Sequence, residues 1–112
     1  MLSLKTSQDF QRVRREGHSW GHPLVVLIAL HNDQDSLRIG IAAGKSVGSA
    51  VARNRAKRRL RSAVRLAETQ MSPGWDVVLI ARPPLLKAKW PEVTEALAQL
   101  MRRAKLMHGS EG

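Results

Sequence analysis

The chain has 112 residues, of which 19 are Lys or Arg and nine are Asp or Glu, giving a formal net charge of +10 at pH 7. A chain of this length fits one domain, and so large a charge points to a polyanionic partner such as nucleic acid. The lack of cysteine excludes disulfides and thiolate metal sites, and the longest apolar run, 24–30, is too short to span a bilayer. We expect a cytoplasmic protein with no membrane segment, with one nucleic-acid-binding domain over 1–108 and a disordered tail at 109–112.

The first predicted element is a short helix over 7–16. Thr6 can cap its beginning, and Gly17 is a natural end. Phe10 and Val13 would share one face of this helix.

Three strands are predicted next. The segment 18–22 fits a brief edge strand or a bend, because it contains glycine and is followed by proline. The apolar run 24–30 is typical of a central strand covered on both faces. A polar turn at 31–35 separates it from the alternating run 37–42, which predicts a hairpin partner.

A long helix follows Gly44 and Gly48 and ends before the Ser-Pro-Gly sequence at 72–74. Its apolar positions lie within about 60° of one line on a helical wheel. This stripe, which we expect to face the core, consists of Ser49, Ala56, Leu60, Ala63, Val64, Ala67 and Met71.

The last predicted elements are a buried strand over 76–81 and a helix beginning near Pro91. The apolar stripe of that helix consists of Val93, Ala96, Leu97, Leu100 and Ala104. The resulting order is helix, three strands, helix, strand, helix. It predicts an α+β fold, an α/β sandwich in which a four-stranded sheet packs against helices.

The long helix and its approach carry most of the charge. Between Ser36 and Ala67 there is no acidic residue, and there are nine basic ones: Arg38, Lys45, Arg53, Arg55, Lys57, Arg58, Arg59, Arg61 and Arg65. Most of them fall on the helix face opposite the apolar stripe, where guanidinium groups can bind phosphates. Arg53 instead falls inside the stripe, so either it reaches into a groove or the helix begins later; we prefer the groove.

An ordered set of residues in this region resembles the signature of the bacterial ribonuclease P protein family. The signature is carried by Lys45, Val47-Gly48, Ala50-Val51, Arg53-Asn54-Arg55 and Lys57-Arg58-Arg59-Leu60-Arg61. The similarity runs from about Leu2 to Leu106 and includes the first helix, the strand at 38–41 and the segment 76–83.

The resemblance implies a fold with a left-handed βαβ crossover, against the usual right-handed rule. It also implies a protein monomer in a 1:1 complex with ribonuclease P RNA, which performs the catalysis with Mg²⁺ and removes the 5′ leader of precursor tRNA. The residues expected to bind the catalytic RNA are Lys45, Arg53, Asn54, Arg55, Lys57, Arg58, Arg59, Arg61 and Arg65.

The same resemblance places the single-stranded leader in a cleft between the first helix and the sheet, with Phe10 and Arg14 as its expected contacts. Arg14 and Ile28 stand where family members often carry further aromatic residues, so leader binding here would depend more on charge. Ser46 stands where a second lysine is common.

No catalytic residue and no metal ligand is predicted in the protein itself. The four histidines lie in irregular or terminal segments, and the acidic residues form no paired-carboxylate motif. The three tryptophans border turns and helix starts and are interpreted as structural. Two other classes stay open: a structural RNA-binding protein of the ribosomal type, and a self-sufficient basic nuclease that would cleave RNA alone with Mg²⁺.

Overall fold

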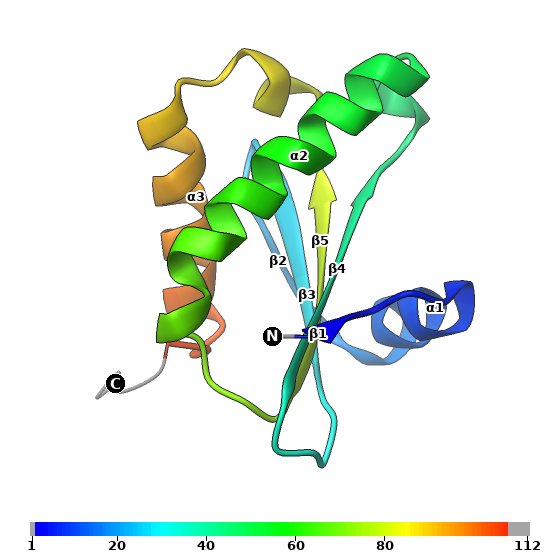
Figure 1. The fold of residues 1–112 in the computed structure, drawn as a ribbon, viewed down its shortest axis with the longest axis vertical. Coiled ribbons are helices and arrows are strands. Elements are labelled where there is room, and N and C mark those ends of the chain that lie inside the picture. The colour runs from blue at the N-terminus through cyan, green and yellow to red at the C-terminus, as the bar shows by residue number, and fades with distance from the viewer. Residues whose placement is uncertain (1, 108–112) are drawn as a thin grey trace.

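The computed structural model describes residues 2–107 and places a five-stranded mixed sheet at its centre (Figure 1). The strand order is β1-β4-β5-β3-β2. β4 pairs in parallel with both β1 and β5, whereas β3 is antiparallel to β5 and β2. The predicted hairpin between 24–30 and 37–42 was therefore wrong, because β5 lies between these two strands. The strands are β1 Leu2–Ser3, β2 His18–Gly21, β3 Val25–His31, β4 Leu37–Ala43 and β5 Trp75–Ala81.

The α+β class is confirmed, but the prediction of four strands was wrong because β1 adds a fifth. Leu2 pairs with Arg38, Ser3 pairs with Ile39, and the Leu4 amide donates to the Ile39 carbonyl at 3.1 Å. Two residues are too few to show a strand periodicity. β1 exists because the edge of β4 supplies its hydrogen bonds.

Helices cover both faces of the sheet. α1 (Ser7–Glu16) packs on one face against β3 and β5, while α2 (Ala50–Ala67) and α3 (Trp90–Arg103) lie side by side on the other (Figure 1). Three short 3-10 helices complete the described chain: η1 (Lys45–Val47), η2 (Glu68–Gln70) and η3 (Pro83–Lys87). Among residues 2–107, no helix combines the length and hydropathy needed to cross a bilayer.

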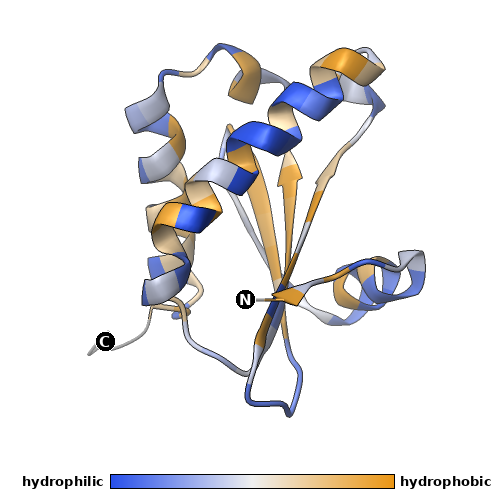
Figure 2. Cartoon of the chain, in the orientation of Figure 1, coloured by the Kyte–Doolittle hydropathy of each residue, from blue (hydrophilic) through white to orange (hydrophobic). Residues whose placement is uncertain are grey.

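Successive side chains of each strand point to opposite faces of the sheet, so the core consists of two clusters, one on each face. The α2 and α3 side is the larger and holds Leu27, Ile39, Val77 and Leu79, together with the apolar faces of both helices. The α1 side is smaller and consists of Leu4, Val13, Ile28 and Val78, with Phe10, Val26, Leu30 and Ile80 packed around them. Figure 2 shows apolar colour along the central strands, whereas strongly hydrophilic residues alternate with apolar ones along α2.

α2 connects two neighbouring parallel strands, β4 and β5, so these elements form a βαβ unit. In Figure 1 both strands run upward, α2 lies in front of them, and the chain moves from β4 on the right to β5 on the left. The crossover is therefore left-handed, as the family resemblance implied.

α1 has the predicted bounds. The Thr6 hydroxyl accepts from the Asp9 amide at 3.1 Å, and the Gly17 amide donates to the Val13 carbonyl at 2.8 Å. The chain turns directly from this end into β2. A Cβ at Gly17 would lie 2.6 Å from the Val13 carbonyl oxygen, so glycine allows the tight connection.

α2 ends earlier than predicted, and Ser49 does not face the core. Ser49 caps it and is exposed, with its hydroxyl accepting from the Ala52 amide at 3.2 Å. The helix ends at Ala67, and Met71 is buried beyond it, in a bridge with Met107. The other members of the predicted stripe, Ala56, Leu60, Ala63 and Val64, are buried, and Ala67 is half-buried.

Every residue of the predicted stripe of α3 is buried. Met101 in the helix and Leu106 after its end are buried as well. The predicted tail at 109–112 lies outside the described residues.

Candidate nucleic-acid interface

Across the residues that the structure describes, no basic side chain of η1 or α2 makes an ion pair with an acidic one. Within residues 2–107, Arg38 is the only one of the nine basic residues between 36 and 67 that makes an ion pair. Arg55, Arg58, Arg61 and Arg65 are exposed on α2, and Lys45 is exposed in η1. The helix therefore presents an uncompensated positive surface, which favours contact with phosphates.

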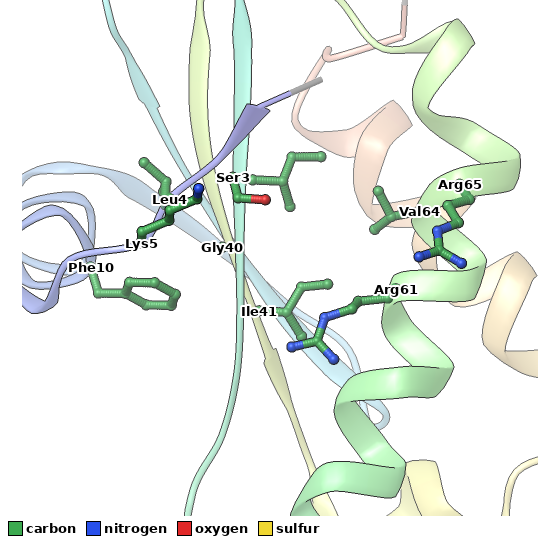
Figure 3. Close-up of a pocket in the computed structure, with 10 residues that line it drawn as sticks. Ser3, Leu4, Lys5, Phe10, Gly40, Ile41, Arg61, Val64 and Arg65 are labelled. Atoms are coloured by element: carbon green, nitrogen blue, oxygen red, sulfur yellow. The ribbon is translucent and has the colours of Figure 1, made fainter.

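A cleft of about 390 Å³ lies where the N-terminal segment and β4 run between α1 and α2 (Figure 3). Phe10 and Lys5 approach it from the α1 side, whereas Arg61 and Arg65 approach it from α2. Its lining residues are Ser3, Leu4, Lys5, Phe10, Ile39, Gly40, Ile41, Arg61, Val64 and Arg65. An aromatic ring, three cations and the apolar side chains of Leu4, Ile39 and Ile41 thus line one cleft.

The ring of Phe10 lies directly on the backbone of β4. A Cβ built at Gly40 would come within 2.5 Å of the Phe10 Cζ atom, so only glycine allows this contact. Phe10 is half-buried, with part of the ring facing the cleft. The structure therefore places one of the two predicted leader contacts at the cleft.

Arg14, the other predicted leader contact, is exposed on α1 and does not line the cleft. Ile28 is buried between α1 and the sheet. The structure instead brings Lys5 to the cleft, which sequence reasoning missed. It also joins Arg61 and Arg65, predicted as contacts of the catalytic RNA, to the Phe10 surface.

Arg53, Asn54 and Lys57 line a second, smaller hollow of about 240 Å³ beside the end of β4. Its other lining residues are Ala43 and Ala50. Because α2 begins at Ala50, the alternative of a later helix start is wrong, and Arg53 lies half-buried in this hollow. Asn54 also faces a neighbouring hollow with Val51, Arg58 and Arg61.

Arg59 has a role that the sequence did not indicate. Its Nη1 donates to the Leu85 carbonyl at 2.6 Å, and its Nη2 donates to the Ala88 carbonyl at 2.7 Å. These bonds fasten η3 and the segment after it to α2. The guanidinium of Arg59 is thus engaged within the protein, unlike those of Arg58 and Arg61, and its contact with RNA stays a prediction.

Asp76 is completely buried at the start of β5 and joins three segments. Its carboxylate accepts from Arg38 at 2.8 and 2.6 Å, from Asn32 at 2.9 Å and from Arg12 at 2.5 Å. Burial alone would raise the pKa of Asp76, but hydrogen bonds from Arg38, Asn32 and Arg12 lower that pKa to about 2. The network ties α1 to β4 and β5 next to the cleft.

In the described part of the chain, no three His, Cys, Asp or Glu side chains gather as a metal site would require. The most buried carboxylate, Asp76, already accepts from two arginines and an asparagine. His108 lies outside the described residues.

Known proteins resemble this chain along almost its whole length. A family model described as ribonuclease P matches residues 1–105. The ribonuclease P protein component of Herpetosiphon aurantiacus is 43% identical over 108 residues, covering 96% of this chain and 88% of the relative. Its counterpart from Roseiflexus castenholzii is 41% identical, with the same coverage of both chains.

Solved structures agree. The ribonuclease P protein of Staphylococcus aureus superimposes with a TM-score of 0.84 at 28% identity, covering 96% of this chain and 99% of that chain. The protein from Thermotoga maritima gives a TM-score of 0.81 at 29% identity, covering 92% and 97% of the two chains. With the left-handed crossover and the basic helix already evident, these matches show that the chain belongs to the bacterial ribonuclease P protein family, as a protein subunit of that endoribonuclease.

Proposed function

We propose that this chain acts by electrostatic positioning, while the RNA subunit of ribonuclease P carries out the cleavage. In this proposal the protein binds the catalytic RNA and the 5′ leader of precursor tRNA and holds the two polyanions together. The observation that carries it is the cleft that Phe10 and Lys5 line from the α1 side and Arg61 and Arg65 line from α2. Proximity supplied this way lowers the barrier to reaction without acid or base chemistry from the protein.

The leader is the proposed occupant of that cleft. A single-stranded nucleotide can stack on the exposed part of the Phe10 ring, and stacking on an aromatic side chain contributes roughly 1–3 kcal/mol per base. Lys5, Arg61 and Arg65 then neutralise the phosphates on either side. Such recognition tolerates any base, because every base has a face that can stack on an aromatic ring.

The catalytic RNA is the proposed partner of the remaining basic surface. Each phosphate that these side chains neutralise releases condensed counterions, which favours association at moderate salt. The arginines can also fork two hydrogen bonds to one phosphate. The side chains proposed for this contact are Lys45, Arg53, Asn54, Arg55, Lys57 and Arg58, with Arg61 and Arg65 shared between the two RNAs.

Mg²⁺ is proposed to belong to the RNA subunit. The donor groups in the described chain do not suit a protein-borne site, because the carboxylate of Asp76 is saturated by Arg38, Asn32 and Arg12. We therefore assign this chain no step that passes through the metal. The proposed assembly is one protein with one RNA in the bacterial cytoplasm.

Reconstitution with the cognate RNA across a Mg²⁺ titration tests this function. We expect the protein to lower the Mg²⁺ concentration needed for cleavage of precursor tRNA, and we expect the protein alone with Mg²⁺ to cleave nothing. Cleavage without the RNA subunit would support a basic nuclease instead. Copurification with ribosomes, and no effect on RNA-catalysed cleavage, would support a ribosomal role.

Single substitutions in the motif test the residue assignments. Arg53→Ala or Arg55→Ala is expected to weaken assembly or cleavage at low Mg²⁺ with little change in the free energy of unfolding. Neither side chain has a hydrogen-bond or ion-pair partner within residues 2–107, so its loss leaves no buried group unpaired. Unchanged cleavage at limiting Mg²⁺ would contradict the assignment.

A further inference from the structure

A separate hollow, here called the Trp90 hollow, opens on the outer surface between α2 and the start of α3, away from the cleft. It has a volume of about 410 Å³ and is lined by Arg55, Arg58, Arg59, Ser62 and Trp90. Trp90 is 39% exposed, although its place at a helix start had suggested a structural role. Most large aromatic side chains of a folded domain are more deeply covered, so this indole is a candidate contact surface.

The backbone that carries Trp90 is held firmly on both sides. Before it, Arg59 fastens the Leu85 and Ala88 carbonyls to α2 at 2.6 and 2.7 Å. After it, the Glu92 carboxylate accepts from the Lys89 amide at 2.7 Å and fixes the first turn of α3. Trp90 is therefore presented in a defined place, which reduces the entropy lost on binding.

The charge around the indole is positive. Arg55 and Arg58 are exposed, and no ion pair within residues 2–107 engages either of them. No acidic residue lines the hollow. Glu92, the nearest acid in the sequence, is engaged with the backbone of Lys89. An indole beside two free guanidinium groups and a hydroxyl matches the chemistry of an unpaired nucleotide: a base to stack and phosphates to pair.

We propose that this hollow binds an unpaired nucleotide of the ribonuclease P RNA, with its base stacked on Trp90 and its phosphates at Arg55 and Arg58. The proposal rests on the proposed function and adds a base-stacking site to it. The catalytic RNA is chosen over the leader because this hollow and the cleft proposed for the leader lie on different flanks of α2. Around the helix, Arg61 and Arg65 at the cleft lie about 60–120° from Arg55 and Ser62, with Arg58 between the two pairs.

Intrinsic tryptophan fluorescence provides the test. The full chain and its Trp90→Phe variant are titrated with ribonuclease P RNA, and their difference isolates the emission of Trp90. We expect saturating RNA to quench this difference signal, because a stacked base quenches an indole. Binding of the RNA, followed separately by gel shift, without quenching of the Trp90 signal would overturn the proposal and leave the proposed function intact. No RNA binding at all would instead contradict the proposed function.

Affinity gives a second measurement. Trp90→Ala is expected to weaken binding of ribonuclease P RNA by about 5- to 100-fold, as expected for one stacked base, while Trp90→Phe retains most of the affinity. The matched control is Leu66→Ala. Leu66 is another exposed apolar side chain, 65% exposed on α2, and does not line the hollow, so its loss should leave affinity unchanged. Equal affinities of Trp90→Ala and the unmodified chain would overturn the proposal.

A third arm separates the two RNA sources. Precursor tRNA with a long leader is added to the assembled holoenzyme after the Trp90 signal has been recorded with the catalytic RNA alone. Quenching that is complete before precursor tRNA is added supports the proposal. Quenching that appears only with precursor tRNA would overturn it and assign Trp90 to the leader. Should Trp90→Ala fail to fold, the Trp90→Phe fluorescence difference still decides the question.

Discussion

Asp76 could not remain charged in its buried position without the groups that surround it. Its neighbours Arg12 and Arg38 carry opposite charge, and Asn32 donates a third hydrogen bond. The pKa of Asp76 is consequently lowered from 3.8 to about 2 despite burial. A carboxylate whose pKa is lowered by folding stabilises the protein above its unfolded-state pKa, and this contribution disappears as the pH falls.

The Asp76 network therefore predicts a pH-dependent stability. Asp76→Asn should lower the free energy of unfolding by about 2 kcal/mol at pH 7, because the pKa is lowered by roughly two units. The difference between the two proteins should shrink as the pH falls from about 4 to 2, where Asp76 becomes protonated. Urea unfolding across this range measures it, with the exposed Asp35→Asn as control. A difference that does not vary with pH would contradict the assigned ionisation.

Arg59 gives a second prediction at the level of one side chain. Lysine has no planar fork and cannot donate to the Leu85 and Ala88 carbonyls together. Arg59→Lys should therefore lower the free energy of unfolding by about 1 kcal/mol, the net value of one lost hydrogen bond. Thermal unfolding would show this. Arg58→Lys, at an exposed position, should be nearly neutral, and equal effects of both substitutions would refute the role of Arg59.

Roles of single residues were the hardest part to predict. In the sequence Arg59 looks like Arg58 and Arg61, since it shares their helix and their charge. Its partners lie 26 and 29 residues away, in η3 and directly after it, and no local pattern links positions that far apart. The partners of Asp76 are separated from it by 38 to 64 residues, with the same consequence.

Among the elements, α1 is placed by the contact of Phe10 with Gly40. Gly40→Ala would put a methyl group within 2.5 Å of the ring, so α1 must shift away from β4 or the ring must leave the cleft. We expect a loss of stability of about 1–3 kcal/mol, as for other overpacked cores. We also expect weaker binding of leader-bearing precursor tRNA relative to mature tRNA.

Gly44→Ala is the matched control for that experiment. A Cβ at Gly44 would meet nothing within 4 Å, and Gly44 does not adopt a left-handed conformation. Urea unfolding and competition between precursor and mature tRNA should therefore leave this variant unchanged. If Gly40→Ala kept both stability and leader preference, the contact between Phe10 and Gly40 would not matter for the cleft.

Prediction of elements succeeded where the signal was local. The cap at Thr6 and the stop at Gly17 fixed α1 at its observed bounds, and the buried stripes of α2 and α3 followed the helical period. β1 was missed because its pairing depends on β4, and α2 was drawn too long because Met71 is buried outside the helix. Phe10 was found through the family resemblance, whereas Lys5 is brought to the cleft by tertiary structure alone.

At the scale of the whole molecule, a charge of +10 is spread over a body of only 36 × 31 × 20 Å. If six to ten phosphates are contacted, affinity for ribonuclease P RNA should fall roughly 10³- to 10⁵-fold between about 50 and 200 mM salt. Filter binding at several salt concentrations measures this slope. A slope near zero would contradict binding by phosphate neutralisation.

Substitutions of selected arginines can show whether the salt dependence comes from the proposed RNA-binding surface or from the net charge of the whole protein. Arg61→Ala combined with Arg65→Ala should make the logarithmic salt dependence shallower by roughly 0.7–0.9 per lost contact. Arg102→Ala lowers the net charge as well, but Arg102 lies on α3 and pairs with Glu95 at 3.1 Å. Its slope should match that of the unmodified chain.

The edge position of β1 bears on how the protein can be labelled. Leu2 directly precedes Ser3, which lines the cleft, whereas α3 lies on the face of the sheet opposite α1 (Figure 1). A purification tag or dye attached ahead of Leu2 would crowd the mouth of the cleft and compete with an incoming leader. The same group attached after Met107 would follow a residue that does not line the cleft, so fusions for assays of substrate capture belong at that end.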